Sequence, residues 1–139
     1  MNLNAEQQHF VNHLRNGRGR LHELRMHAQS LPRGERAAAL LHLFTDSTDF
    51  GHQQIAGRLL VDLKPRCPFA LDDVLLSIAG NWNVSVEELA FYLADVFGPV
   101  NVSDAALSAS RNFQLDDRRH RALGTIAWWL QRRVAESSG

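Results

Sequence analysis

Residues 71–98 read LDDVLLSIAGNWNVSVEELAFYLADVFG. In the first half, apolar residues recur every three or four positions, which is the spacing of a helix that packs one face against a core. These residues are Leu71, Leu75, Ile78 and Trp82. The second half, residues 89–97, is apolar on nearly every side and carries Asp95 as its only charge. The stretch therefore predicts two helices joined by a polar turn, the second of them covered on almost all sides.

Both ends of this second helix carry their own signals. Ser85 is followed three residues later by Glu88, which is the pattern of a capping box that satisfies free N–H groups of a first turn. Gly98 stands where a left-handed C-cap follows a last turn. We therefore expect the helix to begin at Ser85 and to end before Gly98.

Length and composition fit one domain over residues 1–139 that buries its own core. Cys67 is the only cysteine, so no disulfide forms within the chain, which fits a reducing compartment. The first ten residues are polar, and no apolar run reaches the length of a signal segment or a membrane span. These features predict a cytoplasmic protein without a membrane partner.

The formal net charge of zero conceals an uneven distribution of charge. Residues 1–36 hold six arginines and three acids, and residues 111–139 hold the same numbers. Residues 37–110 hold three basic side chains and nine acidic ones. Fourteen of the fifteen cations are arginine, whose forked guanidinium suits carboxylate and phosphate groups. The pattern bears on partners and association and leaves the fold open.

Helical periodicity extends along most of the remaining chain. After an N-cap at Asn4, apolar residues keep a four-three alternation to Leu31, which predicts one long N-terminal helix over residues 1–31. Gly17 and Gly19 fall inside this helix, where each costs about 1 kcal/mol relative to alanine, so they mark a kink or the close approach of another helix.

Polar segments divide residues 35–134 into three helix pairs, and residues 135–139 are expected to be a flexible tail. The pairs cover residues 35–63, 71–97 and 104–134. Pro65 ends the first pair, and Asp116 caps the last helix. Since no strand pattern of useful length is present, the sequence predicts an all-α fold of six to seven helices in antiparallel pairs.

The second helices of these pairs recur at a spacing of roughly thirty to thirty-five residues, which is within the range of helical solenoids. Residues 116–126, DDRRHRALGTI, resemble the second helix of a HEAT repeat: an acid opens the helix, an arginine follows, and Ala-Leu-Gly precedes an aliphatic residue. Residues 93–98, LADVFG, resemble the same pattern less closely. This resemblance implies a curved α-α superhelix that binds partners and performs no chemistry. A compact helical bundle is the alternative.

Three pairs of adjacent acids are candidates for acid–base chemistry: Asp72 with Asp73, Glu87 with Glu88, and Asp116 with Asp117. Neighbouring residues on a helix point about 100° apart. The two carboxylates of one pair therefore cannot face the same substrate atom, as a general acid and base must. Each pair lies in or beside a predicted first turn, where the helix dipole favours negative charge. We therefore assign these acids a structural role.

Histidine and cysteine residues give no complete site in the sequence. His9 and His13 are spaced as two ligands of one metal on a helix face, but His22 and His27 lie turns further along the same expected helix. Cys67 lacks the local signature of a cysteine enzyme. We expect no metal, no cofactor and no catalytic residue.

The last helix carries the most informative surface, opposite its apolar face. An arginine and tryptophan stripe runs along this surface and consists of Arg118, Arg121, Thr125, Trp128 and Arg132, with Trp129 beside it. Arginine stems or another helix could cover the two indoles, because large aromatic side chains are usually buried. Alternatively the stripe is a docking surface, because tryptophan and arginine are enriched at interface hot spots.

The leading functional hypothesis is a protein–protein interaction module that is not an enzyme. It would bind through the last-helix stripe or through the acidic middle, represented by Asp72, Asp73 and Glu87; an acidic face suits a basic partner, as in an immunity or inhibitor protein. The alternative is nucleic-acid binding through the arginines of the first and last helices. If both indoles are exposed, we expect a symmetric homodimer through the last helix.

Overall fold

The computed structural model describes the backbone of residues 2–17, 20–112 and 114–138. These ranges contain eight α-helices, one short 3-10 helix at residues 33–35 and no strand, which confirms the all-α prediction with more helices than the six to seven expected. The α-helices are α1 (Ala5–Arg15), α2 (Leu21–Ser30), α3 (Arg36–His42), α4 (Phe50–Leu63), α5 (Leu71–Ile78), α6 (Glu87–Phe97), α7 (Pro99–Asn112) and α8 (Asp117–Ser138).

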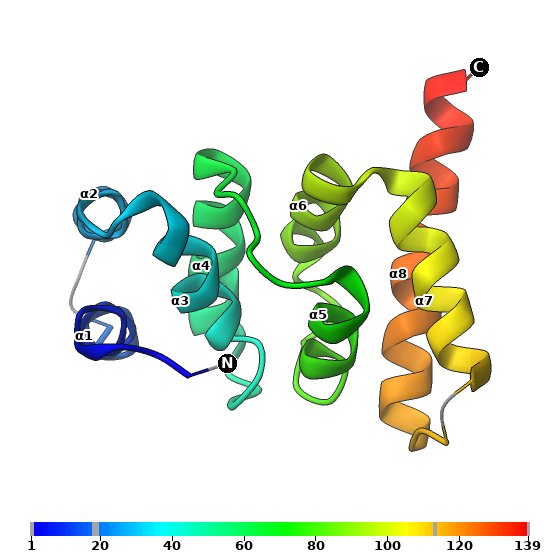
Figure 1. Cartoon of the computed structure of the whole chain (residues 1–139), viewed down its shortest axis with the longest axis horizontal. Coiled ribbons are helices and arrows are strands. Elements are labelled where there is room, and N and C mark those ends of the chain that lie inside the picture. The colour runs from blue at the N-terminus through cyan, green and yellow to red at the C-terminus, as the bar shows by residue number, and fades with distance from the viewer. Residues whose placement is uncertain (1, 18–19, 113, 139) are drawn as a thin grey trace.

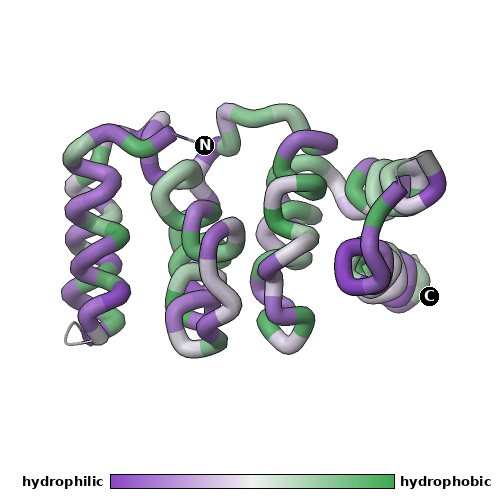
Figure 2. The backbone as a smooth tube through the Cα atoms, turned by 90° about the horizontal axis from the view of Figure 1, so that it is seen from below, coloured by the Kyte–Doolittle hydropathy of each residue, from purple (hydrophilic) through white to green (hydrophobic). Residues whose placement is uncertain are grey.

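Four successive helix pairs lie in a row, with α1 and α2 at one end and α7 and α8 at the other (Figure 1). The pairs change direction along this row. Helices α1 and α2 are seen end-on in Figure 1, whereas α7 and α8 are seen lengthwise. In Figure 2, which is turned by 90°, α7 and α8 are seen end-on and α1 and α2 lengthwise. The row therefore twists, so that its two end pairs present differently oriented surfaces.

The prediction of one long N-terminal helix over residues 1–31 is wrong. Helix α1 ends at Arg15, Gly17 has a positive φ of 68°, and a separate α2 begins at Leu21. Glycine adopts this conformation without the steric cost that other residues incur, so the chain leaves the helix there. The apolar alternation still marks buried positions, because Phe10, Leu14, Leu24 and Ala28 all face the core.

Helix α6 occupies the middle of the molecule, as the sequence predicts. It packs against α4 on one side and against α7 and α8 on the other. Most of its side chains are buried, including Leu89, Tyr92 and Leu93. Because three neighbouring helices cover it, its apolar character on nearly every side has a packing explanation.

The expected caps of α6 are not formed. The helix begins at Glu87, and its N-cap residue Val86 makes no side-chain capping bond. Glu88 instead accepts a hydrogen bond from Gln54 Nε2 of α4 at 3.1 Å, so tertiary packing replaces the capping box with Ser85. Gly98 has φ 91° and ψ 135°, which is not a left-handed helical conformation, because the chain turns at once into α7.

The last helix pair is longer than residues 104–134. Helix α7 begins at Pro99, where a proline suits a first helical position because its missing N–H would be unpaired anyway. The Asp116 cap of α8 is confirmed, since its Oδ1 accepts from the backbone N–H of Arg119 at 2.8 Å. Residues 135–138 continue α8, so the expected tail is wrong for them; Gly139 lies outside the described residues.

A buried amide joins the α3/α4 pair to the α5/α6 pair. Gln53 is fully buried and donates from Nε2 to the carbonyl oxygens of Ser47 and Asn81, both at 2.8 Å. Its Oε1 accepts from the backbone N–H of Asn83 at 2.7 Å. One side chain therefore ties the loop before α4 to the turn between α5 and α6.

The same joint requires close approach of two helices. A Cβ on Gly57 of α4 would lie 3.0 Å from the Cβ of Glu88 and 3.0 Å from Cγ1 of Val86. The turn between α5 and α6 is fixed by Trp82, whose Nε1 donates to the Val86 carbonyl oxygen at 3.0 Å. These contacts set the position of α6, and hence of α8 packed against it.

Candidate functional site

Helix α8 buries one side and leaves the opposite side uncovered. Leu123, Ile126 and Leu130 lie in the core against neighbouring helices. Trp128 projects the other way and is 52% exposed, whereas Trp129 is half-buried. A tryptophan with half its surface in solvent is unusual for a helix whose core face is already complete, so its exposure calls for a functional explanation.

Aromatic and arginine side chains cluster around Trp128. The Trp128 and Trp129 rings meet edge to face with centroids 5.0 Å apart, and Arg132 Cζ lies 5.2 Å from the Trp128 ring centroid. Arg133 Cζ lies 4.7 Å from the ring centroid of Phe91, which α6 contributes. Such contacts hold guanidinium groups in place over apolar surface. We call Phe91, Trp128, Trp129, Arg132 and Arg133 the Trp–Arg face.

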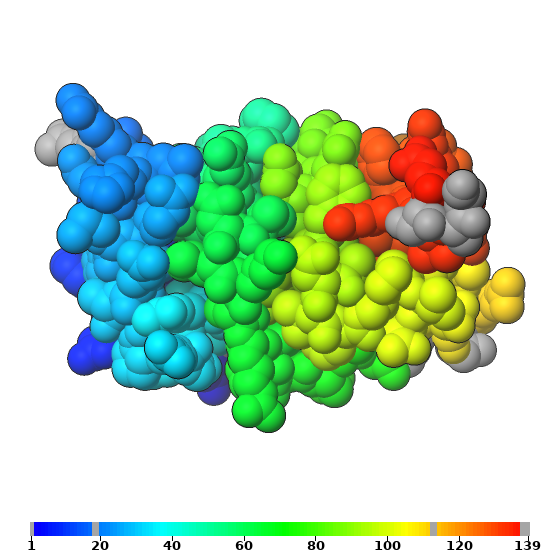
Figure 3. Space-filling view, turned by 90° about the horizontal axis from the view of Figure 1, so that it is seen from above, coloured from blue at the N-terminus to red at the C-terminus, as the bar shows by residue number. Residues whose placement is uncertain are grey.

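The Trp–Arg face contains a hollow. Its volume is about 360 Å³, and four of its members, all except Trp128, line it together with Glu136. In Figure 3, side chains from the C-terminal part of α8 lie against the surface of α6, where this hollow forms. The indole Nε1 of Trp129 is buried and has no hydrogen-bond partner among the described residues. A buried N–H without an acceptor is costly, so a bound group that supplies one would be stabilised there.

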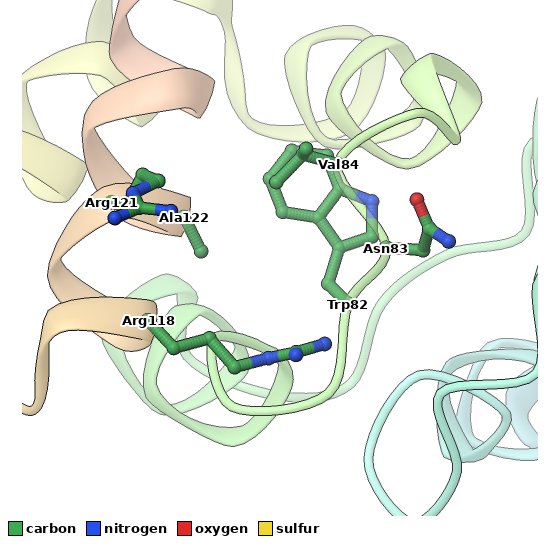
Figure 4. A pocket seen from close by; sticks show the side chains of 6 residues that line it. All are labelled: Trp82, Asn83, Val84, Arg118, Arg121 and Ala122. Carbon is green, nitrogen blue, oxygen red and sulfur yellow. The ribbon is translucent and has the colours of Figure 1, made fainter.

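The N-terminal half of α8 borders a second hollow, of about 280 Å³. Arg118, Arg121 and Ala122 line it from α8, and Trp82, Asn83 and Val84 line it from the turn between α5 and α6 (Figure 4). In Figure 4 the Arg118 side chain extends from α8 towards that turn. Among the described side chains, neither Arg118 nor Arg121 has a carboxylate within ion-pair distance. The helical rise places Arg118 and Trp128 roughly 15 Å apart along α8.

The acidic candidates do not form one surface. Asp72 and Asp73 lie in the first turn of α5, and Glu87 lies in the first turn of α6. Helix α5 runs towards the connecting turn and α6 runs away from it, so these first turns are at opposite ends of the hairpin (Figure 2). Their expected placement in first turns, where the helix dipole favours negative charge, is confirmed.

The arginines of the first and last helices are also separated. Helices α1 and α2 lie at the opposite end of the row from α8 (Figure 1). Arg15 contacts Asp46 at 2.5 Å, and Arg25 contacts Asp62 at 2.6 Å, so the guanidinium groups of the arginines within α1 and α2 are already paired. A single basic surface made of both ends is therefore absent from the described part of the chain.

The turn between α1 and α2 creates a histidine cluster that the sequence did not indicate. Because the chain doubles back after Gly17, His27 Nδ1 lies 2.7 Å from His13 Nδ1, and the His27 ring centroid is 5.3 Å from that of His9. Burial, and then the neighbouring His13 and His9, lower the pKa of His27. The His9 and His13 rings are both tilted against the His27 ring, and the described residues contain no group of three or more side chains arranged to bind a metal ion.

Cys67 and Tyr92 are held in neutral form by their surroundings. Burial raises the pKa of the half-buried Cys67 thiol, whose Sγ donates to the Phe69 carbonyl oxygen at 3.8 Å. Burial also raises the pKa of Tyr92, whose hydroxyl donates to the Pro65 carbonyl oxygen at 2.6 Å. A reactive cysteine has its pKa lowered, so the direction of the Cys67 shift does not favour a thiolate.

Comparison of the chain with models of protein families, with curated proteins and with solved structures found no match. Within the ranges that the structure describes, none of the helices combines the length and the apolar character needed to cross a membrane.

Sequence analysis missed two members of the Trp–Arg face, Arg133 of α8 and Phe91 of α6. The helix of Phe91 is apolar on almost every side, so the periodicity gives no sign that this position reaches the surface. Only the packing of α8 beside α6 reveals that Phe91 borders a hollow.

Proposed function

We propose that this protein is a helical protein interaction module, HEAT-like in its arrangement, that binds its partner through the Trp–Arg face. The observation that carries the proposal is the exposed Trp128, with Arg132 over its ring and a hollow beside it, on a helix whose apolar side is already buried. Tryptophan and arginine dominate the hot spots of protein interfaces, particularly around a pocket that a partner side chain can fill.

The face favours a partner that combines acidic and apolar groups. Arg132 and Arg133 provide forked donors, and Glu136, 3.7 Å from Arg132, is the one acid that lines the hollow. A symmetric homodimer is less favoured, because it would bring Arg132 and Arg133 of two copies to one interface. Binding of a basic partner through the acidic middle of the chain has less support, since Asp72, Asp73 and Glu87 do not form one surface.

The HEAT-like part of the proposal is supported by the row of helix pairs and by its progressive change of direction (Figures 1 and 2). In solenoids each repeat covers its neighbour's apolar face, and the twist between repeats creates extended binding surfaces. A cytoplasmic, reducing location suits the free thiol of Cys67.

Nucleic-acid binding is the weaker alternative. It requires the arginines of α1, α2 and α8 to act together, and they lie at opposite ends of the row. Titration with a random-sequence DNA duplex at about 50 mM salt separates the two proposals, because phosphate contacts give a steep loss of affinity as salt rises. Tight, salt-sensitive binding would favour the alternative.

The proposal is tested by selecting a phage library of random 16-residue peptides against the protein. The affinity of each enriched peptide is then measured for the wild-type protein and for the W128A/R132Q double variant. We expect enriched peptides that combine acidic and apolar residues, with affinity at least 100-fold weaker for the double variant. The matched control is Arg58→Gln, which removes an exposed arginine of α4. Failure to enrich any peptide, or equal affinity for W128A/R132Q, would reject the Trp–Arg face as the binding site.

A solution mass measurement, repeated for Trp128→Ala, tests the homodimer. The proposal expects a monomer in both cases. A wild-type dimer that Trp128→Ala converts to a monomer would assign the face to self-association instead.

A further inference from the structure

A strongly basic hollow lies at the other side of the molecule from α8, between residues 33–36 and residues 63–66. Its volume is about 510 Å³. Arg33, Arg36, Lys64 and Arg66 line it, together with Leu63 and Pro65, and no acidic residue is among its described lining. Figure 3 shows the connection after α4 beside the surface of the segment around α3. Two segments about thirty residues apart in the sequence therefore bring four cations to one concavity.

The carboxylates closest in sequence are engaged elsewhere. Asp62 contacts Arg25 at 2.6 Å and Arg58 at 3.5 Å. The Glu35 carboxylate accepts a hydrogen bond from the side chain of Asn4. As far as the described residues show, Arg33, Lys64 and Arg66 have no ion-pair partner. The hollow therefore holds uncompensated positive charge, which a bound anion would neutralise.

One of the four cations, Arg36, is held in place by hydrogen bonds to the backbone. The Arg36 guanidinium donates from Nε to the Leu31 carbonyl oxygen at 3.1 Å and from Nη2 to the Gln29 carbonyl oxygen at 2.6 Å. Pro65 is buried, and its carbonyl oxygen accepts from the hydroxyl of Tyr92. These bonds anchor Arg36 in one wall and the backbone of Pro65 in the other.

Lys64 has a backbone conformation that normally favours glycine. It has φ 45° and ψ 53° and is the one non-glycine residue with positive φ in the described chain. A left-handed conformation costs roughly 1–2 kcal/mol for a residue with a Cβ, and glycine commonly ends a helix in this way. A lysine at this position carries a structural cost, and it places an ammonium group at the hollow.

We propose that this hollow binds a small anion that carries two or more linked phosphate groups. Four cations spread around one concavity match a chain of phosphates better than a single charge, and guanidinium groups pair with phosphate in forked geometry. Leu63 and Pro65 are the apolar residues of its described lining, which includes no aromatic ring on which a nucleotide base could stack. The site is independent of the Trp–Arg face and of the function proposed for that face.

The test is calorimetric titration of the full chain with inorganic tripolyphosphate at about 50 mM salt. We expect saturable binding of one equivalent, weakened at least tenfold by Lys64→Gly and at least tenfold by Arg66→Gln. Lys64→Gly retains the helix C-cap, because glycine accepts positive φ freely, so loss of folding does not complicate the result. The matched control is the double variant R118Q/R121Q, which removes two cations from the hollow beside Trp82 and should change the affinity less than twofold.

Two further ligands, orthophosphate and ATP, test whether the hollow recognises linked phosphates or a nucleoside. Orthophosphate should bind at least tenfold more weakly than tripolyphosphate, and ATP should bind within threefold of it. Absence of tripolyphosphate binding to the wild-type protein would overturn the proposal, as would equal weakening by R118Q/R121Q. Equal affinity for orthophosphate would overturn the requirement for linked phosphates, and ATP binding more than tenfold tighter than tripolyphosphate would show recognition of the nucleoside.

Discussion

The two ends of the row have the same formal charge and use their arginines differently. Residues 1–36 and residues 111–139 each contain six arginines and three acids. At the N-terminal end Arg15 and Arg25 contact Asp46 and Asp62, both from the acidic middle of the chain. At the C-terminal end Arg118 and Arg121 have no described ion-pair partner, and Arg132 lies over Trp128. Charge counted along a sequence therefore does not say which arginines remain available to a partner.

Packing explains the difference between the ends. Helices α1 and α2 lie beside α3 and α4, whose loop and last turn supply Asp46 and Asp62. Helix α8 lies beside α6, where the outward residue Phe91 is aromatic and the closest carboxylate, Asp95, is 3.9 Å from Arg133. Arg15 and Arg25 therefore pair with carboxylates of neighbouring segments, whereas Arg118 and Arg121 stay without a described ion-pair partner on α8.

The largest expected effect is on the free energy of unfolding, and it distinguishes the buried Trp82 from the exposed Trp128. Trp82 is 1% exposed and donates to Val86, so Trp82→Ala should lower the free energy of unfolding by about 3–5 kcal/mol. Trp128→Ala should change it by less than about 0.5 kcal/mol, because half of its surface is already in solvent. Urea denaturation measures both. A large loss for Trp128→Ala would mean that this indole serves the fold and would break the contrast between the ends.

The next effect concerns the joint between the two ends. Gln53→Leu removes three hydrogen bonds and leaves buried backbone groups unpaired, so it should cost about 2–3 kcal/mol. Gln29→Leu, at an exposed position of α2, is the control and should be near neutral. Amide hydrogen exchange measures the local unfolding of each end separately. If Gln53→Leu leaves the protection of α8 unchanged, the ends are not coupled through this joint.

A smaller effect compares a paired arginine with an unpaired one. Arg25→Gln removes a partly exposed ion pair and should cost about 0.5–1 kcal/mol at low salt, less at 1 M salt. Arg121→Gln should be neutral or slightly stabilising, because the guanidinium has no carboxylate partner to lose and lies near Arg118. Equal losses in urea denaturation at low salt would show that both ends use arginine in the same way.

The pH dependence that His27 contributes should appear at the N-terminal end. The pKa of His27 is lower in the folded state than its ordinary value of 6.5, so the folded protein binds protons less readily than the unfolded chain. Stability is therefore fully present above about pH 6.5 and is lost as the pH falls through the folded-state pKa. Amide exchange in α1 and α2 should accelerate over this range, and His27→Gln should remove the acceleration. Equal acceleration in α7 and α8 would contradict this assignment.

Local pattern predicted the middle of the fold better than the ends. The periodicity of residues 71–98 identified two helices and a turn, and Asp116 identified the start of α8, because both depend on neighbours in sequence. The break at Gly17 was misjudged, and with it the return of His27 to His13. The prediction of a continuous helix placed these histidines several turns apart.

Contacts between distant segments explain what the sequence did not predict at the sites. Trp128 and Arg132 were recognised because they share one helix face, whereas Phe91 joins them only through packing of α8 on α6. Lys64 and Arg66 belong to a segment with an excess of acids, and their placement beside Arg33 and Arg36 follows from tertiary structure alone. The periodicity of the sequence relates residues within one helix and cannot show that residues of two distant segments lie together.

The most direct test of the Trp–Arg face is an NMR titration with one peptide from the selection described above. The chain has three tryptophans and hence three indole N–H signals, assigned by the variants Trp128→Ala and Trp129→Phe and by elimination for Trp82. The account predicts that the Trp128 and Trp129 signals shift in proportion to bound peptide while the Trp82 signal stays in place. A shift of Trp82 with unchanged Trp128 and Trp129 signals would contradict it.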